Sequence, residues 1–159
     1  MKKAINRFLK YGTLISTYCL IGSVLVQIFA RFFLANTPAW TEEASRLFFI
    51  YATAFAAGLA LKDKAYVALD LFFEKLSPSA QKKLLIGIHV LTFILFGLMA
   101  IYTIPFIQLG LPESSPSMKI SMSIAFVSMF ILSSSVSYFA FLEARKIIKN
   151  RSVTNSVVQ

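Results

Sequence analysis

The sequence predicts an all-α integral membrane protein with four transmembrane helices. Three observations support this class: 57% of the residues are hydrophobic and only 14% are charged, the mean hydropathy is +0.72, and uncharged stretches alternate with basic connections. A charge-free run of about 20 residues is long enough to cross a bilayer as a helix. The net charge of +9 is therefore read as a signal of membrane orientation, and no nucleic-acid partner is expected.

Three stretches without Asp, Glu, Lys or Arg predict spans directly, at 11–30, 84–112 and 120–142. A fourth stretch, 47–61, would reach only about 22 Å as a helix, which is short for a hydrocarbon core of about 30 Å. It becomes long enough if the helix begins at Pro38, because proline suits the first helical position. The expected spans are 11–33, 38–61, 80–109 and 120–143, in one domain over 1–150 that a flexible tail follows at 151–159.

Basic residues favour one orientation for all four spans. Thirteen of the 16 lysines and arginines lie in the N-terminal segment, the second connection or the C-terminal tail, and three lie in the other two connections. Loops rich in Lys and Arg stay on the cytoplasmic side, so both termini are expected to face inward. A cleavable signal peptide is the alternative for residues 1–35, but its apolar stretch is longer than usual and no clear small-x-small site follows.

The second connection contains a candidate amphipathic helix over 66–76. Its apolar residues recur at helical spacing, and they are Leu69, Phe72, Phe73 and Leu76. Asp70 and Glu74 fall on the opposite side of such a helix. A helix of this kind can lie on the inner membrane surface or pack beneath a partner protein, and the sequence leaves both open.

No arrangement typical of an enzyme is visible in the sequence, whether a nucleophile–base pair, a metal-ligand cluster or a phosphate-binding glycine loop. We therefore expect no catalytic residue, no metal and no cofactor. His89, the one histidine, is interpreted as a hydrogen-bonded packing residue. The middle of each span also lacks Asp, Glu, Lys and Arg, the residues with which transporters handle a coupling ion. The chain is a poor candidate for carrying a solute alone.

Small residues predict a packing face on the second span. Ala52, Ala56 and Ala60 repeat every fourth residue, and small side chains let helices approach closely in lipid. The facing helix can belong to this chain or to another subunit.

An ionic cluster opens the same span. Glu42 and Glu43 precede Arg46 by four and three residues, so all three can meet on one side of a helix. Trp40 would then lie at the membrane boundary, where its amphipathic ring is favoured. Two compatible interpretations follow: a clamp within the helix, and a charged outer rim offered to another protein.

These motifs, in this order, resemble the small membrane subunit, of DctQ type, of tripartite ATP-independent periplasmic (TRAP) transporters. The resemblance covers about residues 38–142 and rests on "EEASR", "YVALDLFFEKLSP" and "SPSMKISM". The positions that match the family are Glu42, Glu43, Arg46, Asp70, Pro116, Ile120 and Met122. The family usually has tryptophan, glycine and histidine where Tyr51, Lys64 and Tyr66 stand, and often proline where Ser121 stands.

The resemblance implies an accessory scaffold subunit of a sodium-coupled, binding-protein-dependent secondary transporter in a bacterial inner membrane. Such a subunit is a four-helix bundle that forms a heterodimer with a large permease subunit, which holds the sodium and substrate sites. A periplasmic substrate-binding protein delivers an organic acid, of the sialic acid or C4-dicarboxylate class. On this hypothesis the partner-binding or structural residues are Trp40, Glu42, Glu43, Arg46 and Asp70.

Two other functions stay open on the residues alone. One is a small homo-oligomeric exporter with four helices, although its first span would be expected to carry an acidic residue and 11–30 has none. The other is a membrane assembly factor or sensor without transport activity.

Overall fold

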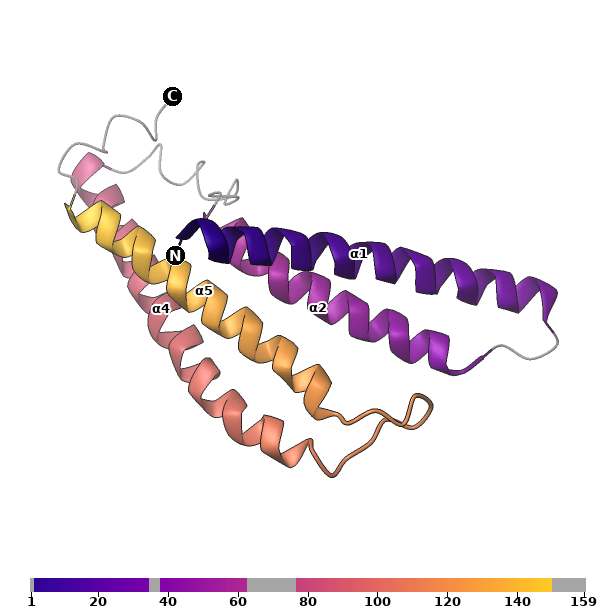
Figure 1. Cartoon of the computed structure of the whole chain (residues 1–159). Coiled ribbons are helices and arrows are strands. Elements are labelled where there is room, and N and C mark those ends of the chain that lie inside the picture. Colours follow the sequence, from indigo (N-terminus) through magenta and orange to yellow (C-terminus); the bar gives the residue numbers. More distant parts are fainter. Residues whose placement is uncertain (1, 35–37, 63–76, 150–159) are drawn as a thin grey trace.

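The computed structural model describes residues 2–34, 38–62 and 77–149, and these form four long helices (Figure 1). The helices are α1 (Lys2–Phe33), α2 (Trp40–Lys62), α4 (Pro78–Leu109) and α5 (Ser123–Lys149). Each is long enough and apolar enough to cross a membrane. The predicted all-helical class with four candidate spans is confirmed. The inward orientation of both termini stays a prediction, and the candidate helix over 66–76 lies outside the described residues.

The described helices lie side by side in the order α1, α2, α5, α4. α1 packs on α2, α2 packs on α5, and α5 packs on α4. The two pairs α1–α2 and α4–α5 diverge from the end of the molecule that holds the N-terminus, and α1 and α4 form the outer edges (Figure 1). The four helices therefore form an open layer rather than a closed bundle (Figure 1). α1 and α4 each pack mainly on one neighbouring helix, and they bury less of their apolar surface than α2 and α5 do.

The contact between α1 and α2 follows a seven-residue repeat. The buried residues of α1 are Leu9, Ser16, Ser23 and Ala30. Seven residues make nearly two helical turns, so such a repeat places one narrow seam against the neighbouring helix. Gly12 lies beside this seam, and a Cβ atom there would stand 2.8 Å from the Phe55 ring. Glycine at this position lets the phenylalanine of α2 lie directly on the α1 backbone.

The contact between α2 and α5 depends on a second glycine. A Cβ atom on Gly58 would lie 2.7 Å from Ser135 Oγ, so the two backbones approach closely at this crossing. Around it lies the apolar core, which consists of Leu9, Phe55, Leu61, Val136, Phe139 and Ala140. Ser135 is buried at this crossing, and its hydroxyl donates to Leu132 O of its own helix. Small residues allow this crossing, as expected for helices in lipid.

The alanines predicted as a packing face of α2 lie mostly outside this core. Ala52 and Ala56 are half-buried and Ala60 is exposed. The residues of α2 that this chain buries are Thr41, Ala44, Ala54, Phe55, Gly58 and Leu61. The alanine stripe is therefore still available at its Ala60 end, and its predicted role against another subunit stays a prediction.

Candidate partner-binding site

The most specific polar contact among the described residues joins the start of α2 to the loop 110–122 between α4 and α5. Ser115 Oγ donates to Glu43 Oε2 at 2.8 Å. The backbone N–H of Ser117 donates to Oε1 at 2.9 Å, and that of Met118 donates to Oε2 at 2.8 Å. Hydrogen bonds to an ionised carboxylate are shorter and stronger than neutral ones. Glu43 therefore holds a loop that lies more than seventy residues away in the sequence.

The loop 110–122 is folded as a short hairpin that suits this contact. Ser114 and Ser121 form an isolated antiparallel bridge, and the N–H of Ser115 donates to Ile120 O at 2.8 Å. Lys119 has φ 54°, a left-handed conformation that costs a lysine about 1–2 kcal/mol. The turn at Lys119 lets the hairpin tip close, and it leaves the N–H groups of Ser117 and Met118 free to meet the carboxylate.

The base of the hairpin is closed by Gly110 and Ser121. Ser121 Oγ donates to Gly110 O at 2.8 Å, and the N–H of Ser123 donates to the same oxygen at 3.1 Å. A Cβ atom on Gly110 would lie 2.7 Å from the Ser123 nitrogen. Glycine is therefore required where the end of α4 meets the start of α5.

A second hydrogen bond ties α2 to α5 near the hairpin. Tyr51 Oη donates to Ile124 O at 2.6 Å, and Ile124 lies in the first turn of α5. The carbonyl groups of a first helical turn are normally used within the helix, so the phenol shares an oxygen with the helical ladder. Together with Glu43, Tyr51 fixes the distance between the two central helices at this end of the molecule.

The three charges at the start of α2 divide into two groups. Arg46 Nη2 lies 3.4 Å from Glu42 Oε1, and both side chains are largely exposed. An exposed pair at this spacing contributes only about 0.3–0.5 kcal/mol. Arg46 thus pairs with Glu42, while Glu43 turns to the hairpin. We call this end of the molecule the rim, and it comprises Trp40, Glu42, Glu43 and Arg46 together with the loop 110–122.

Four of the five residues predicted as partner-binding or structural lie in the rim. Trp40 opens α2 and is 47% exposed, so its ring is available for a membrane boundary or a partner. Asp70 lies outside the described residues. The sequence reasoning missed Ser115, Ser117 and Met118 as partners of Glu43. Two of these three contacts use backbone N–H groups, which leave no pattern of side chains in a sequence.

Elsewhere in the described helices, polar groups are used locally. His89 is buried, and its Nδ1 lies 2.9 Å from Leu85 O one turn earlier, which matches the packing interpretation. Glu143 is buried and paired with Lys146 in the last two turns of α5. Every Asp, Glu, Lys and Arg of these helices lies within about three turns of a helix end.

Four apolar helices, each a candidate membrane span, with a polar network at one end define a multi-span membrane protein. Residues 20–150 match the family model of tripartite ATP-independent periplasmic transporters, DctQ component. The chain therefore belongs to the DctQ family, and it is the small permease subunit of a TRAP transporter. It is a transport component and not an enzyme.

Two relatives agree with this assignment. A Haemophilus influenzae protein described as a TRAP transporter small permease protein is 28% identical over 137 residues, which are 86% of this chain and 82% of that protein. The sialic acid TRAP transporter small permease protein SiaQ of Vibrio cholerae is 26% identical over 97 residues, which are 61% of this chain and 56% of that protein.

Proposed function

We propose that this chain is the accessory scaffold subunit of a sodium-coupled, binding-protein-dependent transporter for organic acids, and that it works as a heterodimer with a large permease subunit. The observation that carries the proposal is the position of its charges. A coupled transporter handles its ion with ionisable groups inside the membrane, whereas the described helices keep theirs near helix ends. The ion and substrate sites then belong to the large subunit. Family membership favours this over an exporter or a sensor.

The apolar edges of the open layer support a pairing role. α1 and α4 expose large side chains along their length, among them Tyr18, Phe29, Leu91 and Tyr102. These surfaces can face lipid or the apolar helices of a larger subunit. The exposed end of the alanine stripe, at Ala60, offers a site of close helix approach. In the scaffold interpretation the exposed end of this stripe packs against the large subunit, whereas the chain's own core leaves it uncovered.

The rim supports a docking role on the periplasmic side. The excess of basic residues in the N-terminal segment, the second connection and the C-terminal tail favours an orientation with both termini in the cytoplasm. In that orientation, which we propose, the rim lies on the opposite side of a bacterial inner membrane. Glu43 fixes the hairpin there, and the exposed Glu42–Arg46 pair lies within the same few turns of α2. A rigid polar surface of mixed charge suits a soluble partner, and we infer that the partner is the periplasmic substrate-binding protein.

The proposed substrate class rests on the family resemblance and on the name of one relative. The Vibrio cholerae relative is named for sialic acid. We propose a sialic acid or C4-dicarboxylate substrate for the whole transporter, delivered by the binding protein and carried by the large subunit.

Reconstitution tests the proposed function directly. Liposomes that contain this chain alone, with a sodium gradient and a binding protein loaded with labelled substrate, are expected to take up nothing. Liposomes that also contain the large subunit are expected to accumulate the substrate. Gradient-driven uptake by this chain alone would contradict the proposal, and so would full uptake by the large subunit without it.

A further inference from the structure

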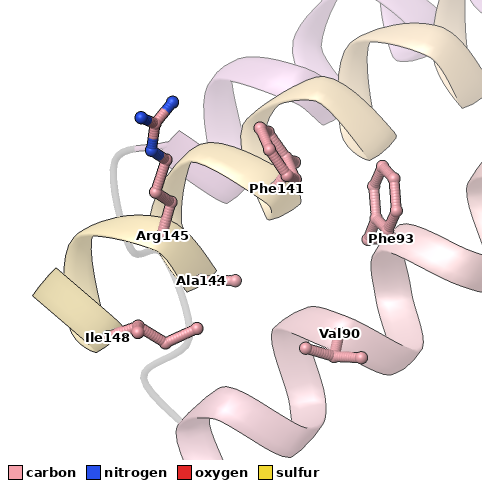
Figure 2. Close-up of a pocket in the computed structure, with 6 residues that line it drawn as sticks. All are labelled: Val90, Phe93, Phe141, Ala144, Arg145 and Ile148. Carbon is pink, nitrogen blue, oxygen red and sulfur yellow. The ribbon is translucent and has the colours of Figure 1, made fainter.

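An apolar groove lies between α4 and α5 near the end where α5 finishes. Its volume is about 300 Å³, and it is lined by Val90, Phe93, Phe141, Ala144, Arg145 and Ile148 (Figure 2). This volume is at the small end of the range for ligand sites in proteins. Nothing in the proposed function uses this groove.

The groove has one closed end. The rings of Phe93 and Phe141 lie with centroids 5.4 Å apart and an interplanar angle of 42°, and they bound the end of the groove toward the middle of the two helices (Figure 2). Beyond the rings, the small side chain of Ala144 points into the space between α4 and α5, with Val90 and Ile148 on either side (Figure 2). A narrow groove with an apolar lining suits a flexible linear apolar chain better than a polar small molecule.

Three basic residues lie in or near the groove. Arg145 is the charged residue of the lining, and its guanidinium points away from the apolar interior (Figure 2). Lys149 follows one turn later on the same side of α5, and Lys83 precedes Val90 by two turns on the same side of α4. All three basic side chains are exposed. The one acid of α4 and α5, Glu143, is buried and paired with Lys146.

We propose that this groove binds an anionic phospholipid. One acyl chain fills the apolar slot, and the phosphate lies against Arg145 and Lys149, with Lys83 beside the opening. Basic pockets between membrane helices on the cytoplasmic side suit anionic headgroups. The assignment to the inner leaflet depends on the membrane orientation in the proposed function, but the binding itself does not.

Two other occupants fit the groove less well. A docked helix needs a long groove with anchor positions over several turns, whereas this groove involves residues of only about one turn of α4 and two turns of α5. A second copy of this chain, related by twofold symmetry, would bring its own Lys83, Arg145 and Lys149 against the same residues. Repulsion between like charges opposes that contact.

Native mass spectrometry of the full chain tests the site. The chain is purified in mild detergent, with and without the large subunit, and titrated with phosphatidylglycerol or with phosphatidylcholine of identical acyl chains. We expect preferential retention of phosphatidylglycerol. The double variant R145Q/K149Q is expected to lose about fivefold in that preference for each basic side chain removed. V90F, which fills the slot at a residue that is 39% exposed, is expected to lower the retention of both lipids.

Matched variants on α1 control for charge and for bulk. K10Q/R31Q removes two exposed basic residues, and V24F adds the same ring at a residue that is 36% exposed. Both are expected to keep wild-type retention. Equal retention of the two lipids by the wild-type chain would overturn the proposal, as would a preference that survives R145Q/K149Q, or a dimer that forms through this face. Co-purification with the large subunit is measured in a separate experiment. Loss of lipid preference with normal co-purification concerns the groove alone, and loss of co-purification by the wild-type chain concerns the scaffold role.

Discussion

At the residue scale, the two glutamates that open α2 have different tasks although they are neighbours in the sequence. Glu42 forms an exposed pair with Arg46, which contributes little to stability. Glu43 accepts three hydrogen bonds from the hairpin, and two of the donors are backbone N–H groups. Without the carboxylate, these N–H groups would lose their acceptor and the loop would lose its support. The cluster that looks like a single clamp in the sequence is therefore one exposed ion pair and one structural anchor.

Glu43→Gln is expected to loosen the hairpin. A carboxamide keeps one acceptor oxygen, so it cannot satisfy all three donors that meet the two carboxylate oxygens. Hydrogen exchange at the amides of Ser117 and Met118 should become faster, as mass spectrometry of hairpin peptides can measure. Glu42→Gln is the matched control, because it removes the neighbouring charge without touching the loop. Equal protection of the hairpin in both variants would show that Glu43 does not anchor it.

The double variant E43A/R46A tests whether the rim docks a partner. We expect normal membrane insertion, weaker docking of the binding protein or weaker assembly with the large subunit, and reduced uptake in reconstituted liposomes. Unchanged co-purification together with full transport would contradict the docking role. Comparison with E42A, which leaves the hairpin anchor in place, separates the loss of the exposed pair from the loss of the loop.

At the element scale, the packing of these helices depends on glycine and serine where helices cross and on large apolar residues where they do not. Gly12 and Gly58 face Phe55 and Ser135 at distances that leave no room for a side chain. Gly22 and Gly87 have nothing within 4 Å of a built Cβ atom. The first pair therefore sets helix positions, while the second pair lies on open surface.

Gly58→Val is expected to force α2 and α5 apart. Overpacking a tight contact typically costs about 1–3 kcal/mol, and the nearest atoms here include Ser135 Cβ at 2.8 Å, which cannot rotate away. The thermal midpoint of the chain in detergent should fall. Gly87→Val provides the control, because the same side chain meets open space and should leave the midpoint nearly unchanged. A similar loss in both variants would show that the close approach at Gly58 does not decide stability.

The alanine stripe of α2 gives a separate prediction about the interface with the large subunit. Ala54 is 1% exposed, so Ala54→Leu should disrupt the chain's own core and lower its stability. Ala60 is exposed, so Ala60→Leu should leave the isolated chain stable and reduce co-purification with the large subunit. If A60L pairs as well as the wild type, the stripe does not face that subunit.

At the scale of the whole molecule, the sequence predicts the helices better than it predicts their neighbours. The uncharged runs reveal α1, α4 and α5, and the polar start of α2 explains how a short apolar stretch can span a membrane. The order α1, α2, α5, α4 has no comparable signal, because lipid-facing and helix-facing residues are both apolar. The contact of Glu43 with the hairpin was also hidden, since backbone N–H groups occur at every position but proline. Two of the three motifs of the family resemblance, "EEASR" and "SPSMKISM", nevertheless meet in that contact.

The orientation of the molecule is the last prediction, and it decides whether the rim can meet a periplasmic partner. Single cysteines at Ser117 and Lys149, both exposed, are placed in a Cys19→Ser background. In intact cells permeabilised only at the outer membrane, a membrane-impermeant maleimide should label S117C and not K149C. After the inner membrane is opened, both should react. Labelling of K149C alone before the inner membrane is opened would show that the orientation is the opposite of the predicted one. The rim would then face the cytoplasm, where a periplasmic binding protein cannot reach it, and the docking role would be excluded.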